Sequence, residues 1–355
     1  MSTSKSETLL LSAADAERAG SMLRAGKLVV FPTETVYGLG ADATREEAAT
    51  AVYRAKGRPP DNPLIVHLAD LEALRAAIPR ECVAARTLAE AFCPGPMTLV
   101  VPAPAWVAPG VRAGLGTVGL RVPAHPVAAA VLMAAGRPIA APSANRSGRP
   151  SPTSFAMAQA EMDGRVDAIV DGGDAEIGLE STVVDARDPR EVRILRPGAV
   201  DAEAIARVVP IASPAFGVEL PPSPGTRYRH YAPAVPVWSH ERGELVERIA
   251  RQSRRSAEIG EGAGAGLAWF VLGPGRSEAG GAGSRCAKLW RMASWEEYGR
   301  KLYRILWEAE RHGASEILLE LPPDTPARAA LRDRIERAAR GDTTDTSREP
   351  GGSAR

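Results

Sequence analysis

Residues 27–40 read KLVVFPTETVYGLG, an apolar run followed directly by a polar segment that contains two glycines. The run Lys27–Phe31 has the length and the β-branched content of a buried strand. Similar runs, bounded by Gly, Pro or Asp, recur as far as about Ile211. They predict further strands at 63–68, 97–101, 118–122, 139–141, 168–170, 182–185 and 192–195.

Alanine- and leucine-rich segments between some of these strands predict helices. These segments are Asp15–Ala25, Leu71–Ile78, Val83–Phe92 and Pro126–Ala135. Several connections between strands are too short for a helical crossover, which favours a mixed sheet over a purely parallel one. The first part of the chain is therefore expected to be an α/β domain with a twisted mixed sheet.

One further helix is marked at both ends. Thr44 and Glu47 have the spacing of an N-terminal capping box. Gly57 can supply the left-handed residue that ends the helix. This places Lys56 in the last turn and Arg58 just beyond it.

The chain is expected to divide into four segments. An α/β domain at 1–212 is followed by the Pro-rich segment 213–236, which is typical of a linker. Alternating strands and helices then predict a smaller Rossmann-like α/β domain at 237–340. Its strands are expected at 235–238, 267–272 and 316–319, and its helices at 244–254, 295–311 and 327–339. The polar tail 341–355 is expected to be disordered.

Composition excludes several classes of function. The 44 Lys and Arg residues nearly balance the 43 Asp and Glu residues, and a nucleic-acid binder that relies on bulk charge would be more basic. No apolar run is long enough to cross a bilayer, and the first residues lack a signal-peptide core. Cys82, Cys93 and Cys286 have neither disulfide nor zinc spacing. A reducing cytoplasm is the expected compartment.

The first polar clusters follow predicted strands or the marked helix. Residues 32–40 offer hydroxyls and close backbone approach to a ligand, although a plain polar turn fits equally well. Lys56-x-Arg58 could clamp a phosphate, while a Lys in a last helical turn also complements the helix dipole. His67 could be a ligand contact or a hydrogen-bonded core residue. No second His or Cys stands at metal-ligand spacing.

Three further clusters lie on or after strands. Thr117 and Arg121 share a strand face. Because an unpaired Arg is costly to bury in an apolar strand, Arg121 is expected either to reach solvent or to bind an anion such as a carboxylate. Ser143 and Asn145 follow a strand that ends in small residues, although they could also form an ordinary Ser or Asx turn. The fifth cluster combines residues 178–182 with Arg196.

Familiar catalytic motifs are absent from the sequence. It contains no G-x-x-x-x-G-K-[ST] phosphate loop and no G-x-S-x-G nucleophile elbow. No Ser-His-Asp or Cys-His system stands out. Spacing and periodicity therefore predict polar strand ends that converge on a small anionic ligand.

The polar clusters also resemble a known family. Lys56-x-Arg58 with Ser143-x-Asn145 is similar to the K-x-R…S-x-N signature of YrdC-type threonylcarbamoyl-AMP synthases. The strings FPTETVYGL (31–39), NPLIVH (62–67), CPGPMT (93–98) and GLESTVV (178–184) resemble that family too. The linker and the second α/β domain are similar to its longer, two-domain form. Roughly residues 10–340 share the likeness, and so many motifs in one order are specific.

The resemblance implies a reaction and its partners. L-threonine and bicarbonate (or CO2) would form a carbamate that attacks the α-phosphorus of ATP, giving threonylcarbamoyl-AMP and pyrophosphate. ATP would bring Mg²⁺ as cofactor. A tRNA threonylcarbamoyl transferase complex would then modify the adenosine beside the anticodon in tRNAs reading ANN codons. Such chemistry needs positioned charge rather than a protein nucleophile.

The resemblance also assigns roles to residues. Arg121 would hold the threonine carboxylate, and Tyr231 would bring the linker over the nucleotide. Lys56 and Asn145, with Arg58 and Ser143, would complete the catalytic signature and act on phosphates. The threonine contacts would be Thr35, His67, Arg121, Ala141 and Ser181. The ATP contacts would be Arg58, Asn62, Thr117, Ser143, Ser151, Arg196 and Tyr231.

Three other interpretations compete with this one. YrdC-like domains have a concave basic surface that could hold RNA, and binding of that kind would weaken steeply with salt. A carbamoyltransferase of the hydrogenase-maturation type would carry cysteine-rich zinc modules, which three isolated cysteines do not provide. A structural protein with a decayed site would not keep competent side chains at the signature positions.

Overall fold

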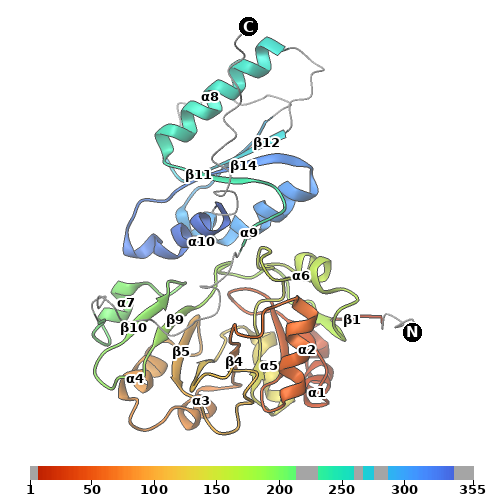
Figure 1. Cartoon of the computed structure of the whole chain (residues 1–355), viewed down its shortest axis with the longest axis vertical. Helices are drawn as coiled ribbons and strands as arrows, with labels where there is room; N and C mark the ends of the chain where they lie inside the picture. Colours follow the sequence, from red (N-terminus) through yellow and green to blue (C-terminus); the bar gives the residue numbers. More distant parts are fainter. Residues whose placement is uncertain (1–6, 213–230, 260–266, 276–286, 340–355) are drawn as a thin grey trace.

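The computed structural model describes residues 7–212, 231–259, 267–275 and 287–339. Its helices and strands form two units, a ten-stranded sheet with its helices and a smaller four-stranded sheet with its helices, drawn below and above in Figure 1. The predicted α/β class with a mixed first sheet is confirmed. The linker and the tail fall mostly outside the described residues, so the predicted domain limits stay predictions.

The large sheet has the order β1-β8-β2-β3-β7-β4-β6-β5-β9-β10. The pairs β1–β8, β2–β8, β4–β6 and β5–β9 are parallel, and the remaining neighbours are antiparallel. The strands are β1 (Leu9–Leu11), β2 (Val29–Phe31), β3 (Gly38–Asp42), β4 (Ile65–His67), β5 (Met97–Pro102), β6 (Thr117–Arg121), β7 (Ile139–Ala140), β8 (Ala168–Val170), β9 (Thr182–Asp185) and β10 (Arg193–Arg196).

Helices cover this sheet at close range. The crossing of α1 and α5 depends on Gly20, because a Cβ there would lie 2.5 Å from the Cβ of Ala134. The predicted helices at 15–25, 71–78, 83–92 and 126–135 are confirmed to within two residues. The helices are α1 (Ala16–Arg24), α2 (Glu46–Lys56), α3 (Leu71–Ala77), α4 (Val83–Phe92), α5 (Pro126–Ala135), α6 (Phe155–Met162) and α7 (Ala202–Ala206).

The start of α2 corrects a prediction, and its end confirms one. The capping box between Thr44 and Glu47 is wrong, because Arg45 is the N-cap and makes no side-chain cap hydrogen bond. Thr44 instead bonds to Asp42, with its hydroxyl donating to Oδ1 over 2.7 Å. At the other end Gly57 has the left-handed φ of 61°, which stops the helix as expected.

The sequence prediction missed β3. This strand pairs antiparallel with β2, matching Val30 with Leu39, so residues 32–37 are the loop of a hairpin. Its sequence GLGAD lacks the β-branched residues on which the strand prediction relied. Gly40 is needed there because a Cβ would lie 2.8 Å from the ring of Phe31. The strand β1 and the helices α6 and α7 were missed as well.

The small sheet is entirely parallel, in the order β11-β14-β12-β13. Its strands are β11 (Val237–His240), β12 (Leu267–Leu272), β13 (Ala287–Arg291) and β14 (Ala314–Glu320). Its α-helices are α8 (Arg242–Ile259), α9 (Trp295–Arg311) and α10 (Ala329–Ala339). The predicted Rossmann-like alternation is thereby confirmed, and only β13 was missed.

The two faces of the small sheet bury different partners. Phe270 packs with Leu245 of α8 on one face, whereas Trp269 packs with α9 and α10 on the other. Figure 1 shows α9 and α10 on the side that faces the large sheet, with α8 on the far side. The cluster under α9 and α10 also contains Val36 and Leu179 from the first unit. One apolar core thus continues across the boundary between the units.

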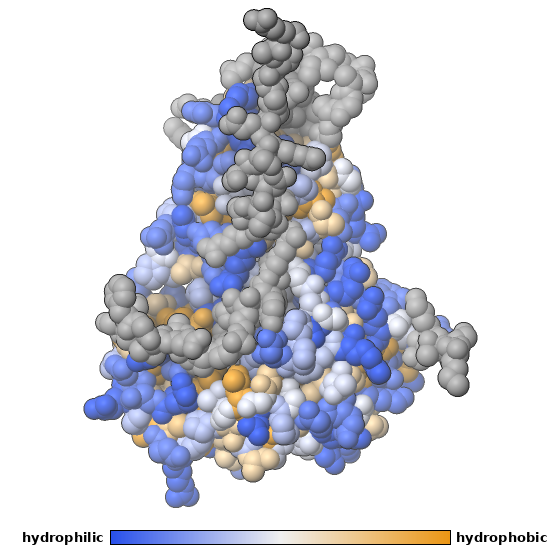
Figure 2. All heavy atoms as spheres, in the orientation of Figure 1, coloured by the Kyte–Doolittle hydropathy of each residue, from blue (hydrophilic) through white to orange (hydrophobic). Residues whose placement is uncertain are grey.

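Figure 2 shows mostly hydrophilic side chains on the visible face, with apolar residues in small groups between them. No described helix combines the length and the apolar character needed to cross a membrane.

Candidate active site

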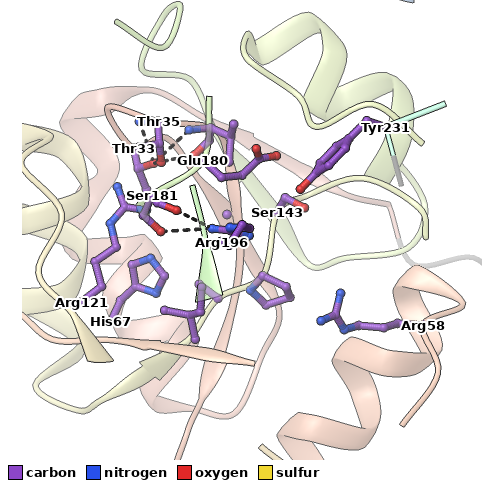
Figure 3. Close-up of a pocket in the computed structure, with 15 residues that line it drawn as sticks. Thr33, Thr35, Arg58, His67, Arg121, Ser143, Glu180, Ser181, Arg196 and Tyr231 are labelled. Atoms are coloured by element: carbon purple, nitrogen blue, oxygen red, sulfur yellow. Dashed lines mark hydrogen bonds between the residues drawn. The ribbon is translucent and has the colours of Figure 1, made fainter. Parts of the chain in front are cut away.

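A pocket opens where the polar strand ends meet (Figure 3). Arg121 and His67 lie at one end of it, Arg58 and Tyr231 at the other, and Arg196 between them. The lining residues are Thr33, Thr35, Val36, Gly38, Arg58, Ile65, His67, Arg121, Ala141, Pro142, Ser143, Glu180, Ser181, Arg196 and Tyr231. All five predicted threonine contacts and four of the seven predicted ATP contacts are among them.

Arg121, at the end of β6, has an internal partner that the sequence prediction missed. Its Nη2 donates to Oε1 of Glu34 over 2.7 Å, and its Nε donates to the carbonyl oxygen of Gly95 over 3.3 Å. Both charged side chains are about 5% exposed. The second carboxylate oxygen of Glu34 has no hydrogen-bond partner among the described residues. The guanidinium is therefore held in place from behind.

His67, at the end of β4, contributes a neutral imidazole to the same end of the pocket. Burial, reinforced by the positive charge of Arg121, lowers the pKa of His67 to about 3. Its ring meets that of Phe31 edge to face at 6.3 Å. Its Nδ1 has no hydrogen-bond partner among the described residues, so one ring nitrogen stays open to a ligand.

Hydroxyl groups line the walls between the two ends. Thr33 and Thr35, in the β2–β3 loop, lie with their hydroxyl oxygens 2.9 Å apart. Ser181, just before β9, shares a hydrogen bond of 2.8 Å with the hydroxyl of Thr98. Nη2 of Arg196 donates to the carbonyl oxygen of Ser181 over 2.8 Å. Each hydroxyl is thus oriented before any ligand arrives.

Arg58 lies outside α2 because Gly57 reverses the backbone. Its Nε donates to the carbonyl oxygen of Asn62 over 3.2 Å, and its Nη2 to that of Pro63 over 3.0 Å. Burial lowers the pKa of Arg58 to about 10, which leaves it charged at neutral pH. Asn62 therefore contacts Arg58 through its backbone, and it does not line the pocket.

Lys56 and Asn145 lie behind the pocket wall rather than in it. Nζ of Lys56 donates to the carbonyl oxygens of Ser143 and Asn145. The amide of Asn145 donates to the carbonyl oxygens of Arg146 and Arg149, and its Oδ1 accepts from the hydroxyl of Ser143. Burial, followed by the charge of Arg58, lowers the pKa of Lys56 well below its usual value. The two residues brace the loop that carries Ser143.

Two other predicted ATP contacts also lie outside the lining. Thr117 is at the start of β6, the opposite end from Arg121. Ser151 is buried, and its hydroxyl donates to Oε1 of Glu180 over 2.7 Å.

The sequence prediction missed Glu180 and its partners from the second unit. Tyr303 of α9 donates to both oxygens of Glu180 over 3.1 and 3.0 Å, and Nε of Arg334 donates to Oε2 over 2.7 Å. Tyr231 stacks on Tyr303, with ring centroids 5.3 Å apart. Glu180 stands in the quoted string 178–184, but nothing in α9 or α10 marks its partners.

This fold and pocket define a two-domain α/β protein whose pocket gathers cations and hydroxyls, a lining that suits an anionic ligand. A family profile described as "Telomere recombination" matches residues 21–198, and one described as "Threonylcarbamoyl-AMP synthase, C-terminal domain" matches residues 200–340. The chain belongs to the two-domain family of threonylcarbamoyl-AMP synthases, which are nucleotidyltransferases.

Individual relatives agree with this assignment. The threonylcarbamoyl-AMP synthase of Bacillus subtilis is 40% identical over 91% of this chain and 92% of its own length. That of Pyrococcus abyssi is 39% identical over 90% of this chain and 93% of its own length. The crystal structure of P. abyssi Sua5 complexed with L-threonine is 35% identical, with a TM-score of 0.80 over 94% of this chain and 98% of that one.

Proposed function

We propose that this chain converts L-threonine, ATP and bicarbonate (or CO2) into threonylcarbamoyl-AMP and pyrophosphate. The threonine nitrogen bonds to the carbon of CO2 and gives up a proton to solvent, or with bicarbonate water leaves. An oxygen of the resulting carbamate then attacks the α-phosphorus of ATP. The bond from that phosphorus to the bridging oxygen breaks, and pyrophosphate leaves. The observation that carries the proposal is a single pocket with Arg121 at one end and Arg58 at the other.

Threonine would bind at the Arg121 end. A crystallised relative is described as complexed with L-threonine, which supports this substrate. The guanidinium of Arg121 would pair with the amino-acid carboxylate, as Arg does in other carboxylate sites. The neutral ring of His67 and the hydroxyls of Thr35 and Ser181 would orient the rest of the molecule. The methyl group of Ala141 leaves space beside them.

ATP would bind toward the Arg58 end. Arg58 and Arg196 would neutralise phosphate charge where it develops during transfer of the adenylyl group. Ser143 and Tyr231 would add hydrogen bonds. The buried network behind the wall, which includes Lys56 and Asn145, would keep these groups in position. The family likeness also predicts ATP contacts for three residues that do not line the pocket. To make these contacts, ATP would have to extend beyond the lining residues to Asn62, Thr117 and Ser151.

Mg²⁺ would arrive with ATP. The described residues contain no group of three His, Cys, Asp or Glu side chains that could hold a metal ion. Glu180 is the one carboxylate among the lining residues, and its oxygens already accept hydrogen bonds from three side chains. Coordination by the phosphates fits this donor set, as Mg²⁺ commonly binds through phosphates and water.

The product would be handed to a tRNA threonylcarbamoyl transferase complex for tRNAs reading ANN codons, in the cytoplasm. An RNA-binding role for the chain itself is the main alternative. Salt distinguishes them, because RNA binding through phosphates weakens steeply with ionic strength, whereas binding of a small ligand in a buried pocket is screened less.

Pyrophosphate release by the purified protein tests the proposal. We expect release that requires ATP, L-threonine and bicarbonate together. Arg58→Ala should lower kcat/KM at least ~100-fold, because oriented charge on the phosphates contributes about 3 kcal/mol or more. Arg54→Ala is the matched control, since Arg54 is exposed in the last turn of α2, four residues before Arg58. Release that ignores threonine, or full activity of Arg58→Ala, would refute the proposal.

A further inference from the structure

The second unit reaches the pocket through two buried side chains, Tyr303 of α9 and Arg334 of α10. We propose that Arg334 and Tyr303 are positioning residues for the ATP end of the pocket, acting through Glu180. The second unit is then part of the nucleotide site. This inference rests on the proposed function and adds two residues to it.

Glu180 joins the two units at the pocket wall. Its carboxylate accepts from Ser151 of the first unit and from Tyr303 and Arg334 of the second. Tyr303 and Arg334 are fully buried, and Glu180 is 6% exposed while lining the pocket. Three donors from both units therefore fix one side chain that a ligand can meet.

The positive charge of Arg334 is what matters to Glu180. Glu180 is the only carboxylate in the lining, and its wall also carries Arg196. Burial alone would raise the pKa of Glu180, but the charge of Arg334, and then that of Arg196, lowers it to about 2. If Arg334 were absent, Glu180 would lose the stronger of the two cations that offset its burial, and Arg196 alone would have to balance the carboxylate as well as face a nucleotide. Arg334 balances the carboxylate from the side opposite the pocket.

The same contact arranges Tyr231, the aromatic residue of the pocket. Its ring stacks on Tyr303 at 5.3 Å and lies 5.3 Å from the guanidinium carbon of Arg334. Its φ of 69° is unusual for a residue with a side chain, so tertiary contacts must hold it. Tyr303 and Arg334 thus support two lining residues at once.

The two units are in close backbone contact at Gly178, so α9 cannot move nearer to that segment. Gly178 has a φ of 77°, and a Cβ there would lie 2.5 Å from backbone atoms of Arg300 in α9. On the facing side, a Cβ on Gly299 would lie 3.1 Å from the side chain of Leu179. The helix α9 therefore rests directly on the segment that ends in Glu180. Its position determines where the carboxylate stands.

The test compares Arg334→Met, Arg334→Lys and Tyr303→Phe with the wild-type chain. The affinity for a non-hydrolysable ATP analogue is measured by calorimetry, and the KM values for ATP and threonine by pyrophosphate release. We expect Arg334→Met to weaken analogue binding and raise the KM for ATP at least ~10-fold, with a smaller change in the KM for threonine. Arg334→Lys should recover part of this loss because it keeps the charge.

Arg304→Met is the matched control. Arg304 belongs to α9, next to Tyr303, and like Arg334 it crosses the boundary, pairing with Asp174 over 3.0 Å, but it is half-exposed and does not line the pocket. Arg304→Met should leave the affinity for the ATP analogue unchanged. If Arg334→Met unfolds, Tyr303→Phe removes only a hydroxyl and should still weaken analogue binding ~3-fold or more.

A double-mutant cycle with Glu180→Gln tests the route of the effect. If Arg334 acts through Glu180, then Arg334→Met should add little to the loss already caused by Glu180→Gln. Additive losses would overturn the inference, as would wild-type affinity in folded Arg334→Met or Tyr303→Phe. A wild-type chain that binds the analogue but releases no pyrophosphate with threonine would contradict the proposed function alone. A wild-type chain that binds no analogue would overturn both.

Discussion

His67 is a neutral group among cations. Burial, and after it the positive charge of Arg121, lowers the pKa of His67 to about 3. At physiological pH the imidazole can donate or accept a hydrogen bond without competing with Arg121 for an anion. The pocket thereby separates charge recognition from hydrogen bonding.

This depressed pKa predicts how stability depends on pH. The unfolded chain takes up a proton on His67 near pH 6.5, whereas the folded chain resists protonation to about pH 3. Stability is therefore complete above pH 6.5 and declines as the pH falls toward 3. Between pH 7 and 5 the loss from this residue should be about 2 kcal/mol. Urea unfolding of wild type and His67→Gln should show a shallower decline in the variant.

His312→Gln provides the comparison for this experiment, because His312 is exposed. It should retain the wild-type slope. Parallel curves for wild type and His67→Gln would contradict the neutral, buried state of His67.

At the level of single residues, only part of the site could be predicted from the sequence. Arg121 in an apolar strand was expected to reach solvent or to bind an anion, and its internal partner Glu34 was not predicted. Glu180, by contrast, bonds to Tyr303 and Arg334, which lie 123 and 154 residues further along the chain. No local pattern encodes a pairing over such separations. Motifs identify side chains, and the fold decides which of them meet.

Among the secondary-structure elements, α2 shows how a helix end places a catalytic candidate. The left-handed Gly57 turns the chain so that Arg58 bonds to the carbonyl oxygens of Asn62 and Pro63 instead of continuing the helix. The opposite end of α2 begins without a side-chain cap. The C-terminal end of α2 is therefore the end that places a pocket residue.

Gly57→Ala should lower the free energy of unfolding by about 1 kcal/mol. A Cβ there meets nothing within 4 Å, so the cost comes from the φ of 61° alone. Gly243→Ala in α8 is the control, because its Cβ also meets nothing and its φ is not left-handed, so it should be neutral or stabilising. Equal effects of the two substitutions in urea unfolding would argue against conformational strain at Gly57.

Strands with β-branched residues were predictable, and those without them were not. The run Val29–Phe31 was recognised, whereas the equally buried β3, with sequence GLGAD, was not. Its place in the sheet comes from pairing with β2 and β7 rather than from its own composition. The predicted capping box is also wrong because of a neighbouring element. The hydroxyl of Thr44 donates to Asp42 at the end of β3 instead of capping α2.

Across the whole molecule, the apolar core that joins the units keeps α9 against residues 178–180. The pairs Arg149–Glu310 and Arg304–Asp174 span the same boundary. The second pair is more than half exposed and contributes little. Packing and the buried Glu180 network therefore hold the units together.

Gly178→Ala should disturb the contact between residues 178–180 and α9, and through it the pocket. The methyl group would lie 2.5 Å from backbone atoms of α9, and the φ of 77° would be strained as well. We expect a loss of about 2 kcal/mol or more in stability and weaker binding of an ATP analogue. Gly173→Ala, with a φ of 80° and nothing within 4 Å, should show the strain without the loss of affinity. Equal affinities of the two variants would contradict close docking.

The ion pair between Glu180 and Arg334 also constrains how such genes can diverge. Once the carboxylate depends on a cation encoded 154 residues away, neither codon can drift alone without leaving a buried charge unbalanced. A lineage that discarded the second unit would have to replace Glu180, or recruit another cation, at nearly the same time. The two positions are therefore expected to change together in relatives that keep both units.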